Sequence, residues 1–204
     1  MKINKKKFIY LISPIKIYKS FYQDLTKVLQ QKKVGFFQLR LKKGSLKKKL
    51  IIGRKIMKIC KRFNVKFLIN DNVFIAKKLN ADGCHLGQKD MNIINARKLI
   101  GNKIIGVTCH NSVRLSKIAV KNKADYIALG AFNNSKTKKI KHRASINLLR
   151  KVKKITKTPV VAIGGINSSN YKNLLLNKAN FLAISGYIWN NKNLKPIEAI
   201  NKLK

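Results

Sequence analysis

Short apolar runs alternate with longer amphipathic segments along most of the chain. The runs are rich in β-branched and aromatic residues, as buried strands are, and cover residues 8–13, 35–41, 65–70, 83–87, 103–109, 126–130, 159–165 and 181–186. The segments between them have helical spacing and predict helices near residues 20–32, 45–63, 72–80, 92–100, 112–122, 145–156, 168–178 and 195–203. Eight strands, each followed by a helix, predict a (β/α)₈ TIM barrel formed by a single domain over residues 1–204.

A doubly wound open sheet would give the same alternation, so the polar residues have to decide between the two folds. Distinctive polar and small residues lie where the predicted strands end, namely Gln38, Arg40, Lys42, Asn70, Asp71, Asp90, Thr108, His110, residues 135–138, Gly164, Gly165, Ser185 and Gly186. In a closed parallel barrel these ends meet at one face, where TIM barrels have their active sites. In an open sheet they would be strung along an edge. The pattern therefore favours the barrel.

The charge balance is strongly basic, with 47 Lys and Arg residues against six Asp and Glu and a formal net charge of +41. A basic surface can bind nucleic acid through phosphate contacts. The lysines are spread along the chain, however, and Asn and Ile are also abundant, so compositional drift explains the charge better than a nucleic-acid-binding surface does. We therefore expect no specific nucleic-acid partner, and we expect each Asp to lie where a lysine would not serve.

The sequence predicts neither a signal peptide nor a membrane anchor. No apolar run approaches the roughly 18 residues that cross a bilayer, and the apolar run at residues 8–13 is too short for a signal peptide. The three cysteines, Cys60, Cys84 and Cys109, match no metal or redox spacing. These features predict a cytoplasmic protein with free thiols and no membrane partner, and they leave the oligomeric state open.

Two acidic residues follow neighbouring predicted strands. Asp71 comes directly after residues 65–70, and Asp90 follows residues 83–87 after a short loop. Because adjacent parallel strands lie about 5 Å apart, the two carboxylates should be close together. An oxygen-only pair suits Mg²⁺, which shares phosphate oxygens with a substrate. The alternative is that each Asp merely caps the helix that follows it.

Other strand ends carry groups that suit anions. Arg40 and Lys42 alternate along the second predicted strand, with Gln38 at the same parity, so they can point to one side. Arg offers phosphate oxygens a planar fork and Lys offers a point charge. The segment SKTKK at 135–139 and the glycine pair at 164–165 could hold a second phosphate through hydroxyl and backbone N–H groups. Two phosphorylated groups are therefore expected.

The remaining titratable residues have less specific interpretations. His110 could be a general base or a hydrogen-bonding scaffold residue, and the sequence does not decide between them. Asp82 and Asp125 precede predicted strands, so we expect them on the opposite face as structural turn residues. Asp24 and Glu198 lie in predicted helices and are expected to be solvated.

Six motifs in series resemble the thiamine-phosphate synthase family. They are Q-L-R-x-K at 38–42, I-N-D at 69–71, A-D-G-C-H-L-G-Q-K-D at 81–90, G-V-T-C-H at 106–110, G-A-F-N-N-S-K-T-K at 130–138 and A-I-G-G-I at 162–166. The family is a (β/α)₈ barrel that joins 4-amino-2-methyl-5-hydroxymethylpyrimidine diphosphate to a thiazole phosphate, giving thiamine phosphate and pyrophosphate. The resemblance therefore implies a transferase of thiamine biosynthesis.

The resemblance also implies a role for each matching residue. Asp71 and Asp90 would bind Mg²⁺ as the cofactor. The pyrimidine diphosphate would be held by Gln38, Arg40, Lys42, Asn70, Thr108 and Lys138, and the thiazole phosphate by Ser135, Lys136, Thr137, Gly165, Ile184 and Ser185. The family's reaction is dissociative and needs charge stabilisation of the leaving pyrophosphate, which makes Arg40, Lys42 and Lys138 the expected catalytic residues.

Some positions depart from the family pattern. Leu41 stands where an acidic residue is common, Thr108 replaces serine, and Asn134-Ser135 replaces Pro-Thr. A thiazole tautomerase or a non-catalytic thiazole-phosphate-binding relative would share the barrel but lack much of the diphosphate-binding apparatus, which this chain retains. A basic nucleic-acid-binding barrel is a third hypothesis, motivated by the charge.

Overall fold

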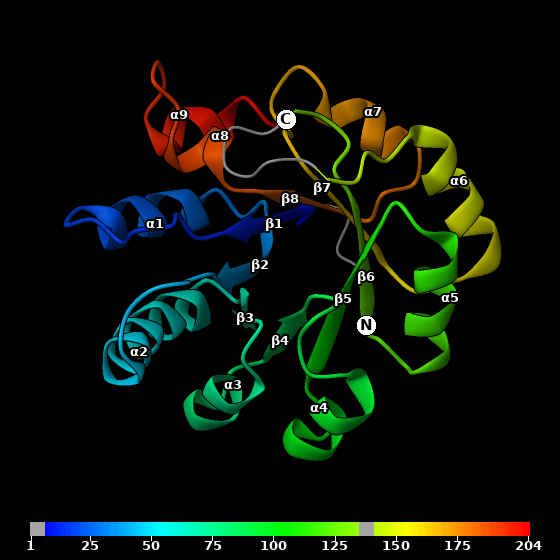
Figure 1. The fold of residues 1–204 in the computed structure, drawn as a ribbon. Coiled ribbons are helices and arrows are strands. Elements are labelled where there is room, and N and C mark those ends of the chain that lie inside the picture. The colour runs from blue at the N-terminus through cyan, green and yellow to red at the C-terminus, as the bar shows by residue number, and fades with distance from the viewer. Residues whose placement is uncertain (1–6, 135–140) are drawn as a thin grey trace.

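The computed structural model describes residues 7–134 and 141–204. Within them, eight parallel strands pair in sequence order and β8 pairs with β1, which closes a barrel (Figure 1). The strands are β1 (Ile9–Ile12), β2 (Val34–Leu39), β3 (Lys66–Asn70), β4 (Gly83–Leu86), β5 (Ile104–His110), β6 (Tyr126–Gly130), β7 (Val160–Ile163) and β8 (Phe181–Ile184). The predicted TIM barrel is confirmed. The open-sheet alternative is wrong, because every strand here is paired on both sides.

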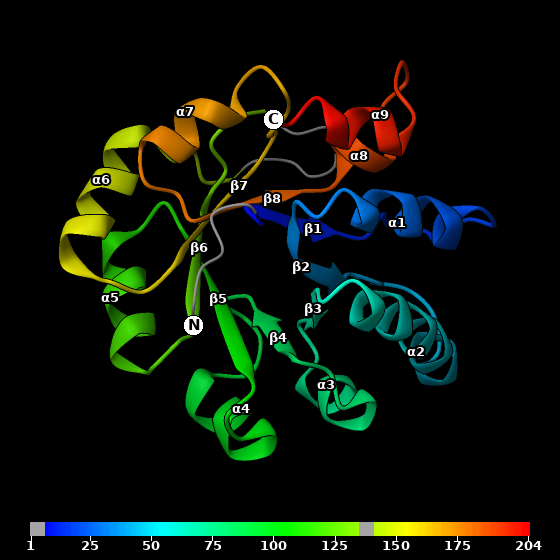
Figure 2. The ribbon, with the colours of Figure 1, turned by 180° about the vertical axis from the view of Figure 1, so that it is seen from behind.

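Helices surround the barrel in both views (Figures 1 and 2). They are α1 (Phe21–Gln30), α2 (Leu46–Arg62), α3 (Val73–Leu79), α4 (Ile93–Ile100), α5 (Val113–Lys121), α6 (Ile146–Ile155), α7 (Tyr171–Leu176), α8 (Gly186–Trp189) and α9 (Pro196–Asn201). All the predicted helices are present, and the single turn α8 is an addition that helical spacing could not indicate. Helix α9 packs against α1 and α8, so the last helix lies beside the first.

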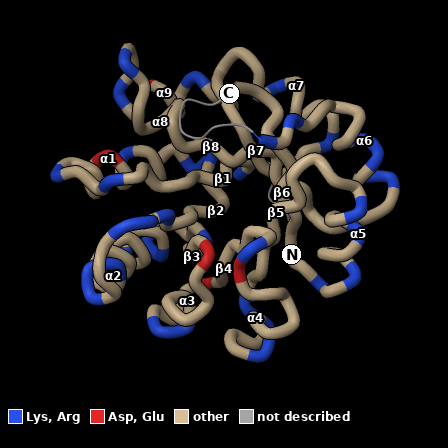
Figure 3. The backbone as a smooth tube through the Cα atoms, in the orientation of Figure 1, with Lys and Arg blue, Asp and Glu red and all other residues tan. Residues whose placement is uncertain are grey.

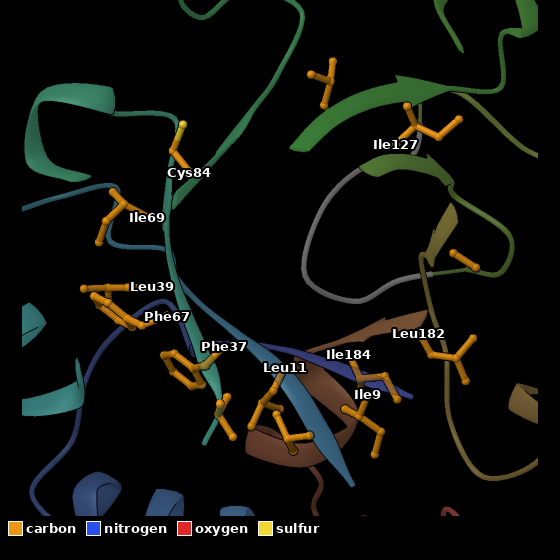
Figure 4. Close-up of a cluster of buried hydrophobic side chains, with 14 of the residues drawn as sticks. Ile9, Leu11, Phe37, Leu39, Phe67, Ile69, Cys84, Ile127, Leu182 and Ile184 are labelled. Carbon is orange, nitrogen blue, oxygen red and sulfur yellow. The ribbon is translucent and has the colours of Figure 1, made fainter. Parts of the chain in front are cut away.

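Alternation along the strands sorts side chains between two cores. Ile9 and Leu11 of β1 belong to the larger cluster between the strands and the helices, part of which is drawn in Figure 4. Tyr10 and Ile12 belong to a second cluster inside the barrel, which also contains Phe36, Leu68, Tyr126, Ala128, Val161, Phe181 and Ala183. Because successive side chains of a strand point to opposite faces, most of the strands contribute to both cores.

Gly106 makes room for a large side chain inside the barrel. A Cβ atom at this position of β5 would lie 1.8 Å from Cζ of Tyr126, so any larger residue would collide with the ring. The Tyr126 ring stacks on the imidazole of His85, with the ring centroids 5.6 Å apart. Because Gly106 has no side chain, the Tyr126 ring of β6 can cross β5 and stack on His85 of β4.

Two carboxylates hold the N-terminal face of the barrel together. Asp82, just before β4, accepts a hydrogen bond from the backbone N–H of Phe67 at 2.9 Å. Asp125, just before β6, accepts one from the backbone N–H of Ile105 at 2.9 Å. Each also pairs with a basic side chain, at 2.8 and 2.7 Å respectively. The prediction that both are structural turn residues, remote from the opposite face, is confirmed.

The surface is basic all round. Lys and Arg lie on helices around the whole barrel rather than on one face, while acidic residues stand out near β3 and β4 (Figure 3). The thiols of Cys60, Cys84 and Cys109 are buried and free, as predicted. Across residues 7–134 and 141–204, none of the helices has the length and apolar character that a bilayer crossing requires.

Candidate active site

The C-terminal ends of β3 and β4 fix the first predicted metal ligand. Asn70 ends β3 in register with His85 of β4. The next residue, Asp71, donates its backbone N–H to the carbonyl of His85 at 2.8 Å. Its φ of 63° lies in the left-handed region, which is uncommon for a residue other than glycine. Asp71 is therefore held in a particular conformation at the junction of these two strands.

The carboxyl group of Asp90 lies close enough to that of Asp71 to act on its pKa. The pKa of Asp71 is raised, first by partial burial of its carboxyl group and then by the charge of Asp90 and a hydrogen bond to it, while the Arg40 guanidinium and the Asn70 side chain act in the opposite direction. The backbone N–H of Gly87 donates to Oδ2 of Asp90 at 2.6 Å and orients it. Two carboxylates this close repel each other, and a divalent cation with oxygen ligands would relieve that repulsion.

The number of protein ligands suits Mg²⁺ shared with a substrate. In the part of the chain that the structure describes, no group of three or more His, Cys, Asp or Glu side chains could hold a metal ion. Two carboxylates would leave most coordination positions to water and phosphate oxygens. This is the usual arrangement for Mg²⁺, which gives up its water reluctantly.

Neither Asp caps a helix. Helix α3 has Asn72 as its cap, whose Oδ1 accepts from the backbone N–H of Ile75 at 2.9 Å. Helix α4 has Asn92 as its cap, which accepts from the backbone N–H of Asn95 at 2.9 Å. The capping interpretation of Asp71 and Asp90 is therefore wrong, because asparagines one and two residues further on perform that role.

Arg40 and Lys42 lie in a loop rather than on a strand. Since β2 ends one residue before Arg40, the prediction that strand parity aligns both with Gln38 is wrong. Arg40 is instead fixed by its backbone N–H, which donates to Oγ of Ser13 at 2.9 Å. Its guanidinium lies close enough to Asp71 to act on the pKa of that carboxyl group. Lys42 is exposed beside it.

A chain of hydrogen-bonded polar side chains runs through the barrel interior. Gln38 lies close enough to the hydroxyl of Tyr10 to act on its pKa, and that hydroxyl lies 2.7 Å from the hydroxyl of Tyr126. The Tyr126 hydroxyl lies 2.8 Å from Nδ1 of His85, and Nε2 of His85 lies 2.8 Å from Oγ1 of Thr108. The chain leads from the vicinity of Gln38 to Thr108, two predicted substrate-binding residues, through three residues to which the sequence analysis gave no role.

Burial determines the protonation of this polar chain. It raises the pKa values of Tyr10 and Tyr126 above those of ordinary tyrosines. It lowers the pKa of His85 to about 4, although the charge of Asp90 acts weakly in the opposite direction. At neutral pH both phenols and the imidazole are therefore uncharged, and the imidazole carries a single N–H.

The ends of β7 and β8 form the other side of the site. Gly164 and Gly165 have φ values of 108° and 58°, which favour glycine. A Cβ atom at 165 would lie 2.0 Å from the carbonyl oxygen of Asn134, so the segment before residue 135 passes close to this turn. Ile184 ends β8, and Ser185 follows it. The predicted residues Ser135, Lys136, Thr137 and Lys138 lie outside the described residues.

Ser13 connects the two sides of the site. It follows β1 and is buried, with its Oγ accepting the Arg40 N–H and its carbonyl accepting the Ser185 hydroxyl at 3.2 Å. Closure of the barrel places β1 between β2 and β8, which gives Ser13 these two partners. The sequence carried only a weak signal for it, a hydroxyl residue at the end of an apolar run.

Comparisons with known proteins agree with this geometry. A family model described as "Thiamine monophosphate synthase" matches residues 9–188. A thiamine-phosphate synthase of Pelagibacter ubique is 67% identical over 207 residues, which cover 100% of both chains. The chain belongs to the thiamine monophosphate synthase family.

Two further comparisons support membership of the thiamine monophosphate synthase family. A thiamine-phosphate synthase of Erythrobacter litoralis is 37% identical over 196 residues, which cover 94% of this chain and 92% of that protein. The solved structure of a thiamine phosphate pyrophosphorylase from Pyrococcus furiosus has a TM-score of 0.86 and 26% identity, and covers 98% of this chain and 94% of that one. The predicted enzyme class, a transferase, and the predicted thiamine-phosphate synthase activity are confirmed.

Within this thiamine monophosphate synthase fold, the ring of His110 packs against that of His142. His110 ends β5 with a φ of 52°, and its ring centroid is 4.3 Å from that of His142. His85, one strand earlier, is the histidine that contacts a predicted substrate-binding residue. Strand parity could have revealed it, since the apolar Cys84 and Leu86 on either side of His85 pack toward the helices, which turns His85 to the barrel interior.

Proposed function

We propose that this family member catalyses the Mg²⁺-dependent condensation of 4-amino-2-methyl-5-hydroxymethylpyrimidine diphosphate with 4-methyl-5-(2-phosphoethyl)thiazole. The products are thiamine phosphate and pyrophosphate. The observation that carries the proposal is the position of Asp71 and Asp90 after the neighbouring strands β3 and β4, where Asp90 and Arg40 both lie close enough to act on the pKa of Asp71. In a chain of net charge +41, a carboxylate pair next to a guanidinium is the arrangement that a metal-bridged diphosphate needs.

The diphosphate would lie at the ends of β2, β3 and β4. Asp71 and Asp90 would hold Mg²⁺, which when bound supplies positive charge to the leaving diphosphate. Arg40 would add a planar pair of donors and Lys42 a mobile ammonium group. The pyrimidine would be held by Gln38, Asn70 and Thr108. The support for this set is that the described residues converge at neighbouring strand ends of a closed barrel.

The reaction requires positioning and charge stabilisation rather than a protein nucleophile. The bond between the pyrimidine methylene carbon and the diphosphate oxygen breaks first, and its electron pair leaves with the oxygen. The thiazole nitrogen then donates its lone pair to the methylene carbon, forming the new bond. Arg40, Lys42 and Lys138 would act as the catalytic residues by stabilising the negative charge on pyrophosphate as it departs.

The thiazole phosphate would lie on the other side of the barrel mouth. Its ligands would be Ser135, Lys136, Thr137, Gly165, Ile184 and Ser185. The left-handed conformation of Gly165 and its closeness to Asn134 support a phosphate site here, because loops after the seventh and eighth strands are where such barrels bind phosphate. Cytoplasmic location remains a prediction, as do the absence of a nucleic-acid partner and of a membrane partner.

The test is a condensation assay with both substrates and a titration of Mg²⁺, following thiamine phosphate and pyrophosphate together. The wild type should form both products in equal amounts only when Mg²⁺ is present. Asp71→Asn and Asp90→Asn should each raise the Mg²⁺ requirement or abolish turnover. Asp24→Asn is the matched control, because it makes the same change on the outer helix α1 and should leave the Mg²⁺ dependence unaltered.

Two outcomes would contradict the proposal. A folded wild type that forms no product at any Mg²⁺ concentration would refute the condensation. If that protein still bound thiazole phosphate, the result would favour the tautomerase or a non-catalytic binding relative. Wild-type Mg²⁺ dependence in both Asp variants would instead leave the activity standing and remove these residues from the metal site.

A further inference from the structure

We propose that His85 is a positioning residue for the condensation. Through Nε2 it fixes the orientation of the Thr108 hydroxyl toward the pyrimidine substrate, and through Nδ1 it is itself fixed by Tyr126. The inference rests on the proposed function, since it requires Thr108 to contact that substrate. The inference goes beyond the proposed function because it assigns a role to an interior residue that is not one of the proposed substrate ligands.

The imidazole has a defined partner on each nitrogen. Nδ1 lies 2.8 Å from the Tyr126 hydroxyl and Nε2 lies 2.8 Å from Oγ1 of Thr108. The ring is stacked on Tyr126 with an interplanar angle of 19°, and Tyr10 meets it edge-on with centroids 6.5 Å apart. The backbone carbonyl of His85 also accepts the N–H of Asp71. Position and rotation of the imidazole are therefore both restricted.

The hydrogen bonds of this chain have a common direction. An uncharged imidazole carries one N–H, so one nitrogen donates and the other accepts. If Nε2 donates, the hydroxyl proton of Thr108 is free for an acceptor on the substrate. If Nε2 accepts, that proton is bound and the oxygen faces a substrate donor. In either case the Thr108 hydroxyl makes one hydrogen bond to His85, and it presents either its proton or its oxygen, but not both, to the substrate.

The placement of the chain argues against a purely structural role. Most of the cluster inside the barrel is apolar, and a wholly apolar filling would avoid burying hydroxyl and imidazole groups. The chain instead ends on Thr108 of β5, and its other end, Tyr10, lies close to Gln38 of β2; Thr108 and Gln38 are both proposed pyrimidine ligands. Gly106 supplies the space that allows the Tyr126 ring to reach His85. The packing of Tyr126 over Gly106 therefore fixes His85, and His85 in turn fixes the Thr108 hydroxyl that faces the proposed substrate site.

The test is a double-mutant cycle on kcat with His85→Asn, Thr108→Val and the combined variant, in the condensation assay with saturating Mg²⁺. Asn places an amide near the position of Nδ1, so the contact with Tyr126 can persist while the contact with Thr108 is lost. His85→Gln places an amide near Nε2 and is the rescue variant. Circular dichroism and thermal melting verify that each variant is folded.

We expect H85N to lower kcat by about 10- to 100-fold, the scale of a misplaced contact, with little change in the KM for thiazole phosphate. H85Q should recover most of the rate. In the T108V background H85N should cause little further loss, because the hydroxyl that His85 orients is already gone. Losses that multiply in the combined variant, with no rescue by H85Q, would overturn the inference.

Two further outcomes are decisive. If H85N does not fold, the same cycle uses Tyr126→Phe, which keeps the imidazole but removes the partner of Nδ1. Tyr126 is only 1% exposed and lies within the barrel, so a loss of kcat that disappears in T108V again supports positioning, and a loss that multiplies contradicts it. A wild type without turnover would overturn the proposed function and this inference together, whereas an active wild type with multiplying losses would overturn this inference alone.

Discussion

Removal of the Tyr126 hydroxyl is the sharpest test of whether the interior polar chain stabilises the fold. Tyr126→Phe keeps the ring that packs over Gly106 and stacks on His85, and deletes one oxygen atom. That oxygen lies 2.7 Å from the Tyr10 hydroxyl and 2.8 Å from Nδ1 of His85. The substitution therefore breaks two buried hydrogen bonds with almost no change in packing.

The expected cost follows from those two contacts. A hydrogen bond contributes about 0.5–1.5 kcal/mol to stability, and a buried polar group left without a partner costs about 1–3 kcal/mol. Gln38 lies beside the Tyr10 hydroxyl and stays available to it as a partner, so the main unsatisfied group is Nδ1 of His85. We expect Y126F to lower the free energy of unfolding by about 2–4 kcal/mol. For a chain of this size, that corresponds to a melting temperature lower by roughly 5–15 °C.

The assay is urea unfolding at neutral pH, followed by circular dichroism and tyrosine or tryptophan fluorescence. Tyr187→Phe is the matched control. The Tyr187 hydroxyl is also buried, but has no hydrogen-bond partner among the described residues. Its removal should leave stability within about 0.5 kcal/mol of the wild type or raise it, because a desolvated hydroxyl without a partner contributes no favourable contact.

The comparison of the two variants carries the conclusion. A large loss in Y126F and none in Y187F would show that the partners of the hydroxyl matter rather than the hydroxyl itself. Equal effects in both variants would refute the assignment of stabilising hydrogen bonds to the interior chain. A change in the slope of unfolding against urea would indicate instead that the substitution altered the denatured state or the two-state character of unfolding.

Three further substitutions test other parts of the structure. Because the pKa of Asp71 is raised in the folded protein, the metal-free wild type should lose stability as the pH rises through that pKa. Asp71→Asn should show neither this loss nor the rise in melting temperature that Mg²⁺ causes in the wild type. Thermal melts across pH, with EDTA or with Mg²⁺, test both expectations. Gly106→Ala should destabilise by about 1–3 kcal/mol or prevent folding, because its Cβ would lie 1.8 Å from Cζ of Tyr126, and a urea midpoint equal to wild type would contradict the packing. Asp82→Asn should cost about 1–2 kcal/mol by weakening the bond from Phe67, yet leave kcat unchanged because Asp82 lies on the opposite face; reduced kcat in a stable variant would count against that placement.

The strands and helices could be predicted because their apolar periodicity is local. Each predicted helix agrees with the structure to within a few residues at either end, and the eight apolar runs became the eight strands. The predicted second strand was too long at its C-terminal end, and this produced the incorrect parity argument for Arg40 and Lys42. A strand ends where pairing with its neighbours ends, which a single run of residues does not reveal.

The roles of the acidic residues could be predicted in part from how few there are and from where they lie relative to the strands. In a lysine-rich chain, their location before or after a strand separated Asp82 and Asp125 from Asp71 and Asp90, and the structure confirms the role of the first two at the N-terminal face. The choice between a helix cap and a metal site remained open, because Asp suits both. The structure removes the capping role by showing that Asn72 and Asn92 are the caps.

The sequence by itself determined the order of elements, the class of fold and the residues that gather at the strand ends, because hydrophobic period and turn chemistry are encoded over short stretches. Only the tertiary structure decided which side chains touch across the barrel. Ser13 acquires its partners Arg40 and Ser185, which follow β2 and β8, only when the barrel closes. The Tyr126 ring of β6 reaches His85 of β4 only because Gly106 leaves space on β5, the strand between them. Such contacts depend on register and closure, which bring together residues that are distant in the chain.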